Sequence, residues 1–137
     1  MNINGDIIII EDDEDDREFF ELIYNELSFN NKLVFFKDAF TALDYLKSPI
    51  AQPFLIISDI NMPKLSGFEL RNIIFTDNKL KDLCIPYIFM TTASAPEIVK
   101  EAYSMSIQGF FKKESDYEKQ KEIMQRIILY WKESYTP

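Results

Sequence analysis

The sequence contains no histidine, one cysteine and only three glycines among its 137 residues. The absence of histidine excludes histidine-based acid–base catalysis and every metal site that needs an imidazole ligand. The single cysteine, Cys84, cannot form an internal disulfide and suits a reducing compartment. We expect it to be a small buried hydrophobic residue. The chemistry of this protein must therefore rely on carboxylates, hydroxyls and lysines.

Positive charge and long apolar runs are also scarce. The 23 acidic residues outnumber the 15 basic ones, which gives a formal net charge of −8. This acidity disfavours binding to nucleic acid or to an anionic membrane surface. No apolar run approaches the roughly 20 residues of a membrane-spanning helix, and no secretory leader is recognisable. We therefore expect one cytoplasmic globular domain over residues 1–137, with neither nucleic acid nor membrane as a partner.

Short apolar segments alternate with helical patterns along the chain. Five segments have the composition of buried strands, namely residues 7–10, 33–36, 54–57, 86–90 and 109–111. Five helices are expected between and after them, because apolar residues recur there at helical spacing. Asp38 is suited to cap the second helix, and Ser94 and Ser115 begin sequences with capping-box spacing. The alternation predicts an α/β fold with a doubly wound five-stranded parallel sheet and five helices.

Polar side chains follow the predicted strands at their carboxyl ends. Right-handed crossovers bring all five of these ends to one edge of a parallel sheet, where open α/β sheets bind their ligands. Asp59 ends the central apolar run, and the other strand ends carry Glu11, Asp12, Thr92 and Lys113. We therefore expect a shared site around Asp59.

Converging carboxylates repel one another and raise at least one pKa unless a cation joins them. Mg²⁺ (or Mn²⁺) prefers oxygen ligands, and Asp12 and Asp59 would supply two of them. A lysine and a threonine hydroxyl beside a metal-bound carboxylate are the groups that phosphoryl transfer requires, with the carboxylate as nucleophile. The acids at 14–16 fit a solvated helix start better than a site. No glycine-rich nucleotide-binding loop is present.

Four motifs, in this order, make the sequence similar to the receiver domain of two-component response regulators. They are residues 7–13 (IIIIEDD), 58–63 (SDINMP) with Gly67, 90–93 (MTTA) and 109–113 (GFFKK). The resemblance implies a flavodoxin-like, stand-alone receiver without an output domain. It implies a phosphoprotein that takes a phosphoryl group from a histidine kinase or histidine phosphotransfer protein. Such a domain is no enzyme beyond its own phosphorylation and dephosphorylation.

The resemblance also assigns roles to single residues. Asp59 would be the phosphoacceptor, contacted after transfer by Lys113, by Thr92 and by the backbone N–H of Ala93. The metal would be held by Asp12, Asp59 and the backbone carbonyl of Asn61, with Glu11 acting through water. Phe110 would be the aromatic ring that turns inward on activation.

Two positions depart from the family pattern. Glu114 stands where a proline usually follows the lysine through a cis peptide, so the lysine must be chosen by strand register. Adjacent strand residues point to opposite sides, and we favour Lys113 over Lys112. Glu11 stands where aspartate is commoner, and its extra methylene favours ligation through water.

Two other functions remain open at this point. One is a receiver-like binding module that does not switch, and the other is a haloacid-dehalogenase-type phosphohydrolase. The hydrolase normally has a second aspartate two residues after its nucleophile, where this chain has Asn61, and it carries a cap domain. The kinase and the downstream protein target are not identified by the sequence. Tyr130, Trp131 and Tyr135 fit a core, a homodimer surface or a partner surface, and we expect Trp131 in the core.

Overall fold

A five-stranded parallel sheet forms the centre of the molecule, with the strand order β2-β1-β3-β4-β5. The structure is a computed structural model that describes residues 2–137. The strands are β1 (Asp6–Ile10), β2 (Leu33–Phe36), β3 (Pro53–Ser58), β4 (Tyr87–Thr91) and β5 (Gly109–Lys112). All neighbouring pairs are parallel. The predicted doubly wound α/β fold is confirmed.

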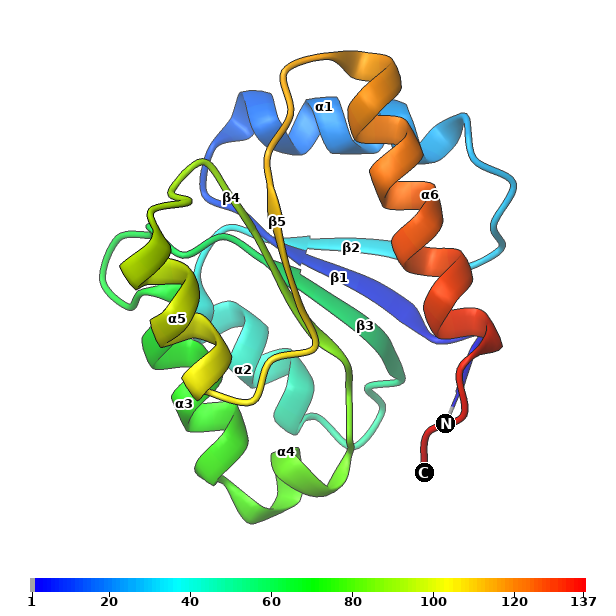
Figure 1. Ribbon diagram of the computed structural model, residues 1–137. Coiled ribbons are helices and arrows are strands. Elements are labelled where there is room, and N and C mark those ends of the chain that lie inside the picture. Colours follow the sequence, from blue (N-terminus) through cyan, green and yellow to red (C-terminus); the bar gives the residue numbers. More distant parts are fainter. Residues whose placement is uncertain (1) are drawn as a thin grey trace.

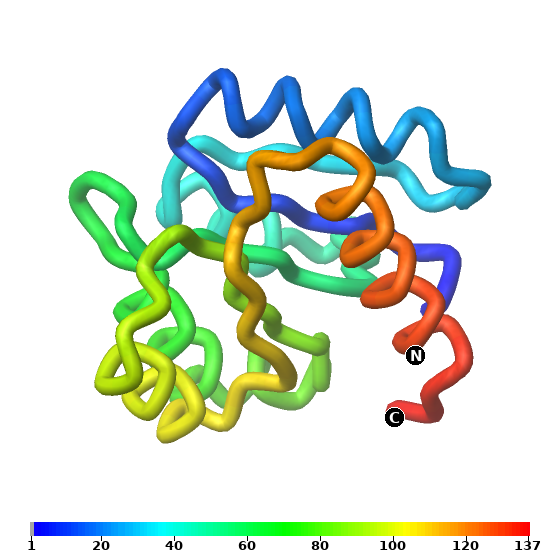
Figure 2. The backbone as a smooth tube through the Cα atoms, turned by 45° about the horizontal axis from the view of Figure 1, so that its top comes forward, coloured from blue at the N-terminus to red at the C-terminus, as the bar shows by residue number. Residues whose placement is uncertain are grey.

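Helices cover both faces of this sheet (Figure 1). They are α1 (Glu14–Asn25), α2 (Ala39–Lys47), α3 (Gly67–Thr76), α4 (Asn78–Asp82), α5 (Pro96–Ser104) and α6 (Tyr117–Glu133). The hydrophobic core on one face includes side chains of α1 and α6, and the core on the other includes side chains of α2 to α5. Figure 2 shows α1 above the strands and the green and yellow helices below them. Within residues 2–137, no helix combines the length and apolarity needed to cross a bilayer.

The isoleucine run of β1 shows why the central strands are apolar at nearly every position. Ile7 and Ile9 pack in the core beneath α1 and α6, whereas Ile8 and Ile10 pack in the opposite core. Successive side chains of a strand point to opposite faces, so a strand covered on both sides needs apolar residues throughout. The short uninterrupted runs of the sequence therefore predicted the strands correctly.

Helix starts differ from the sequence prediction in detail. Residues 2–137 form six helices rather than the five expected, because the short α4 follows α3 directly. The capping box predicted at Ser94 is wrong: α5 begins at Pro96 after Ala95, which makes no side-chain cap bond. The cap of α6 is Asp116 rather than Ser115, since its carboxylate accepts the N–H of residue 119 at 2.9 Å. Asp38 does cap α2, as predicted.

Cys84 is exposed, so the prediction of a buried thiol is wrong. It lies in the turn between α4 and β4 with a φ of 51°, a left-handed conformation that directs the chain into β4. Trp131 is partly buried against the core beneath α1 and α6, in agreement with its expected place. Tyr130 and Tyr135 are exposed.

Candidate functional site

Asp59 lies directly after β3, at the carboxyl edge of the sheet. It is 9% exposed. Its carboxylate oxygen Oδ1 accepts the N–H of Ile60 at 2.7 Å, and its own N–H donates to the carbonyl of Ile10 at 3.0 Å. These bonds fix both the side chain and the backbone of Asp59 at the carboxyl edge, beside the last residue of β1.

The loop after Asp59 is packed so closely that residue 67 must be glycine. The N–H of Gly67 donates to the carbonyl of Ile60 at 2.7 Å. A Cβ atom at position 67 would lie 2.1 Å from the backbone oxygen of Asp59, which no real side chain tolerates. The start of α3 therefore packs directly against the Asp59 loop. The side chain of Ser66 caps this helix by accepting the N–H of Glu69 at 3.1 Å.

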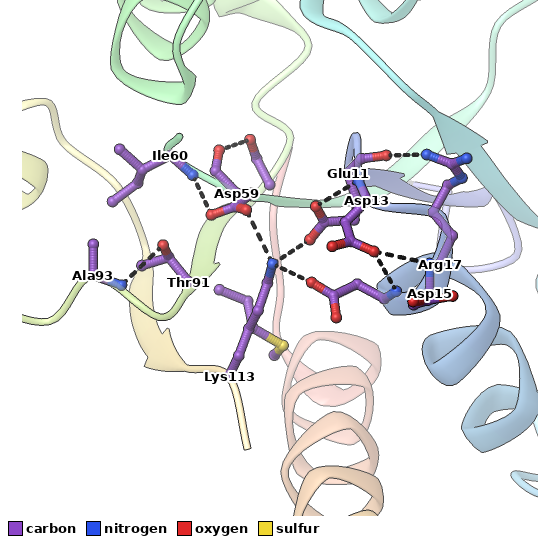
Figure 3. Close-up of polar contacts among 12 residues, drawn as sticks. Glu11, Asp13, Asp15, Arg17, Asp59, Ile60, Thr91, Ala93 and Lys113 are labelled. Atoms are coloured by element: carbon purple, nitrogen blue, oxygen red, sulfur yellow. Dashed lines mark hydrogen bonds and ion pairs between the residues drawn. The ribbon is translucent and has the colours of Figure 1, made fainter. Parts of the chain in front are cut away.

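Lys113 reaches Asp59 from the end of β5 (Figure 3). Its Nζ lies 2.9 Å from Oδ2 of Asp59 and 2.8 Å from Oδ2 of Asp16, and it also pairs with Glu11. The lysine side chain is only 11% exposed. Lys112, by contrast, is exposed on the last position of the strand. The strand register thus directs Lys113, and not Lys112, to Asp59.

Asp16 is a residue of this cluster that the sequence analysis did not single out. It was assigned to a solvated helix start, and its side chain is indeed 39% exposed. However, it lies in the first turn of α1, which begins immediately after the acidic end of β1. That placement brings its carboxylate back over the sheet edge to Lys113. Because α1 packs against α6 and the sheet, only the tertiary arrangement reveals the contact.

The carboxylates at this edge carry more negative charge than one ammonium neutralises. Carboxylate oxygens of Glu11, Asp12 and Asp59 lie within 4.8 Å of one another. Burial, together with the neighbouring charge of Asp59, raises the pKa of Glu11 to about 7, although Lys113 opposes the shift. Burial lowers the pKa of Lys113, but its carboxylate partners outweigh burial and raise it. An oxygen-rich group of this kind fits a hard divalent cation such as Mg²⁺.

The hydroxyl at the end of β4 belongs to Thr91 rather than to the predicted Thr92. Thr91 is the last residue of β4 and fully buried, whereas Thr92 is exposed beyond the strand. The Oγ1 of Thr91 accepts the N–H of Ala93 at 3.3 Å, and in Figure 3 both residues lie on the side of Asp59 away from Glu11. The sequence places two threonines in succession, and the end of β4, with Thr91 buried as its last residue, distinguishes between them.

The remaining predicted residues occupy the surroundings of the cluster. The ring of Phe110 is partly buried against the core beneath α2 to α5, with its centroid 6.4 Å from that of Phe89. Asn61 is exposed in the loop after Asp59. Among residues 2–137 no peptide bond is cis, so Glu114 follows Lys113 through a trans peptide. The N–H of Glu114 donates to Oε1 of Gln120 at 2.8 Å.

Comparison with known proteins identifies the family. The model of the response regulator receiver domain matches residues 7–127. The chain belongs to this family. The receiver domain is 30% identical over 113 residues to the chemotaxis protein CheY-3 of Vibrio cholerae, covering 82% of this chain and 83% of that protein. It is 25% identical over 129 residues to the probable methanogenesis regulatory protein FilR2 of Methanothrix harundinacea, covering 91% and 82% respectively.

Solved structures of response regulators share the fold of this receiver domain. The phosphorylated cyanobacterial phytochrome response regulator RcpA superposes with a TM-score of 0.85 at 22% identity, over 97% of each chain. The Mn²⁺-bound form of response regulator Rcp1 gives 0.81 at 24% identity, over 96% of this chain and 97% of that one. Receiver domains are signalling modules of two-component systems that bind a divalent metal, and they are not classical enzymes.

Proposed function

We propose that this receiver domain accepts a phosphoryl group on Asp59 from the phosphohistidine of a histidine kinase or histidine phosphotransfer protein. A carboxylate oxygen of Asp59 attacks phosphorus, the P–N bond to the donor imidazole breaks, and an aspartyl phosphate forms. The observation that carries the proposal is the Asp59 carboxylate itself. It is bonded to Lys113 at 2.9 Å and lies among the carboxylates of Glu11 and Asp12.

The acidic cluster supplies ligands for the metal that this transfer needs. Asp12 and Asp59 would hold Mg²⁺ or Mn²⁺ directly, the backbone carbonyl of Asn61 would add a third ligand, and Glu11 would act through water. When bound, the cation neutralises charge on the transferring phosphoryl group. Burial of Glu11 and exposure of Asp12 support this division of labour, because the exposed carboxylate is the one that an incoming hydrated ion meets first.

Lys113, Thr91 and Ala93 would hold the phosphoryl oxygens once the aspartyl phosphate has formed. The ammonium of Lys113 already contacts Asp59 and needs no large movement. We assign the hydroxyl role to Thr91, since Thr92 is exposed beyond the strand. The N–H of Ala93, now bonded to the Thr91 hydroxyl, would turn to the phosphoryl group. Donors that are already oriented toward the developing charge are what stabilise phosphoryl transfer.

The signal would leave through the face of β4 and β5 and the helices beside it. Phosphorylation stabilises one of two conformations, in which the Thr91 hydroxyl moves toward Asp59 and the Phe110 ring turns inward. Phe110 packs on the same core as α5, so its movement would reshape that surface for a downstream protein target or a second copy of the chain. We propose that residues 1–137 act as a single cytoplasmic receiver module. The family match favours neither the non-switching module nor the haloacid-dehalogenase-type hydrolase.

A labelling experiment tests the proposal. The protein is incubated with Mg²⁺ and acetyl phosphate, and the phosphoryl adduct is followed by intact-mass spectrometry. We expect one Mg²⁺-dependent adduct on the wild type and none on Asp59→Asn. Asp38→Asn is the matched control, because Asp38 follows β2 at the same sheet edge but caps α2 instead of joining the cluster. An adduct on Asp59→Asn, or equal labelling after chelation of the metal, would refute the assignment.

A further inference from the structure

Gln120 is a fully buried polar residue in the apolar stripe of α6. It is 0% exposed, and it precedes the core residues Met124 and Ile127 at helical spacing. Burying an amide costs free energy unless its polar atoms find partners. A leucine or methionine would fill the same place without that cost. The presence of glutamine here must therefore be explained by what its side chain contacts.

Both ends of the Gln120 amide are bonded. Its Oε1 accepts the N–H of Glu114 at 2.8 Å, and its Nε2 donates to Sδ of Met90 at 3.1 Å. The orientation of the amide is unambiguous, because a backbone N–H can only donate and so must face the oxygen. Met90 is buried in β4, next to Thr91. The glutamine thus ties the segment after β5 to the strand that carries Thr91.

Two hydrogen bonds, one of them to Gln120, hold the backbone on both sides of Lys113. The N–H of Lys113 donates to the carbonyl of Thr91 at 2.9 Å, which fixes the peptide before the lysine. The next N–H, that of Glu114, is held by Gln120, which fixes the peptide after it. With both peptide planes held, the direction in which the Cα–Cβ bond of Lys113 leaves the backbone is set. That direction carries its ammonium to Asp59.

We propose that Gln120 is a positioning residue, whose amide holds the Glu114 N–H and thereby keeps Lys113 directed at Asp59. The role rests on the proposed function of Asp59, and it is exerted through the backbone rather than through contact with the phosphoryl group. It depends on residue 114 having an N–H to be satisfied. Proline has no such group, so the glutamine is needed only because Glu114 occupies that position.

The pair can be tested with three variants and one control. Gln120→Leu removes the acceptor, Glu114→Pro removes the donor, and the double variant removes both. Gln108→Leu is the matched control, because the Gln108 side chain also accepts a backbone N–H, that of Tyr87 at 2.7 Å, but at the opposite edge of the sheet. Two quantities are measured for each: hydrogen exchange of the Glu114 amide by NMR where that amide exists, and the saturating rate of Mg²⁺-dependent labelling by acetyl phosphate.

We expect Gln120→Leu to accelerate exchange of the Glu114 amide and to lower the saturating labelling rate by about tenfold, with half-saturation by the donor unchanged. The double variant should recover labelling to within about threefold of the wild type, because the proline ring fixes φ at residue 114 and leaves no unpaired N–H. Gln108→Leu should lower the melting temperature without slowing the labelling of folded protein. Rescue by the second substitution is an outcome that simple destabilisation does not produce.

The proposal would be overturned if Gln120→Leu were labelled at the wild-type rate. It would also be overturned if the double variant were labelled no faster than Gln120→Leu. A slowed exchange of the Glu114 amide would overturn it too. If the wild type itself were not labelled, the proposed function of Asp59 would fail. The exchange measurement would still decide whether Gln120 holds the Glu114 N–H, so the two failures are distinguishable.

Discussion

Polar side chains at the two edges of the sheet have different kinds of partner. At the amino edge, two side chains bind backbone groups: Arg71 donates to the carbonyls of Met105 and Ser106 at 3.1 and 2.7 Å, and Gln108 accepts the N–H of Tyr87. At the carboxyl edge, the carboxylates of Glu11, Asp16 and Asp59 converge on the single ammonium of Lys113.

This difference between the two edges indicates which one serves stability and which one serves function. Backbone partners are present in every folded molecule, so Arg71 and Gln108 need no ligand to satisfy these side-chain groups. The carboxyl edge holds an excess of negative charge, which is costly at low exposure and which a bound cation would relieve. Excess charge in a partly closed site is therefore a stronger indication of function than burial of a charge alone.

Replacing the lysine should have the largest effect. Lys113→Met leaves three carboxylates facing one another, and we expect the free energy of unfolding to fall by about 3 kcal/mol without metal. Labelling of the folded protein should slow by about 100-fold. Chemical denaturation with and without Mg²⁺, together with intact-mass kinetics, measures both. Unchanged stability would mean that the carboxylates do not depend on Lys113 for compensation.

Bound metal should stabilise the folded protein through the carboxyl edge alone. Mg²⁺ at about 100 times its Kd should raise the free energy of unfolding by about 2.7 kcal/mol. Asp12→Asn should remove most of this gain, whereas Asp15→Asn, which removes the same charge from an exposed position of α1, should retain it. Denaturation curves across a Mg²⁺ titration provide the measurement. Equal losses in both variants would indicate only a general charge effect.

A substitution at the amino edge should lower the free energy of unfolding without changing the rate of phosphoryl transfer. Arg71→Met removes a donor from each of the Met105 and Ser106 carbonyls, although Ser106 keeps the Nε2 of Gln108 at 3.0 Å. It also removes the guanidinium from the rings of Phe75 and Tyr87, whose centroids lie 5.2 and 5.3 Å away. We expect a loss of about 2 kcal/mol in the free energy of unfolding and an unchanged labelling rate of the folded protein. A labelling rate that fell with stability would show that the two edges are coupled.

The smallest effect is expected at Asp16. Its side chain is 39% exposed, so Asp16→Asn should change the free energy of unfolding by less than about 1 kcal/mol. Labelling should accelerate by no more than about threefold, because Lys113 loses one competing partner. Asp15→Asn again serves as the control in the labelling assay. A tenfold slower reaction would instead make Asp16 part of the transfer chemistry.

Much of this architecture could be predicted from local patterns. Runs such as residues 7–10 specify strands buried on both faces, and parallel topology then places their carboxyl ends together. Asp59, Glu11 and Lys113 were found in this way, because each lies within two residues of the end of an apolar run. Asp38 was recognised as a cap from its own short-range chemistry.

Features that depend on one-residue register or on distant partners could not be predicted. Thr91 and Thr92 are equivalent in the sequence, and only the end of β4 distinguishes the buried residue from the exposed one. Cys84 was expected inside from its apolar neighbours, but a left-handed turn leaves it exposed. Gln120 lies 30 residues from Met90, and nothing local indicates that the two side chains meet.

Local chemistry, then, was enough to decide the order of elements, the fold class and the strand ends that carry acids, since hydrophobic periodicity and capping act over a few residues. Which side chains touch was decided by the tertiary structure, because contacts between α1, β4, β5 and α6 depend on packing across the whole sheet. The convergence of Glu11, Asp16 and Asp59 on Lys113 belongs to this second class. So does the bond by which Gln120 holds the Glu114 N–H.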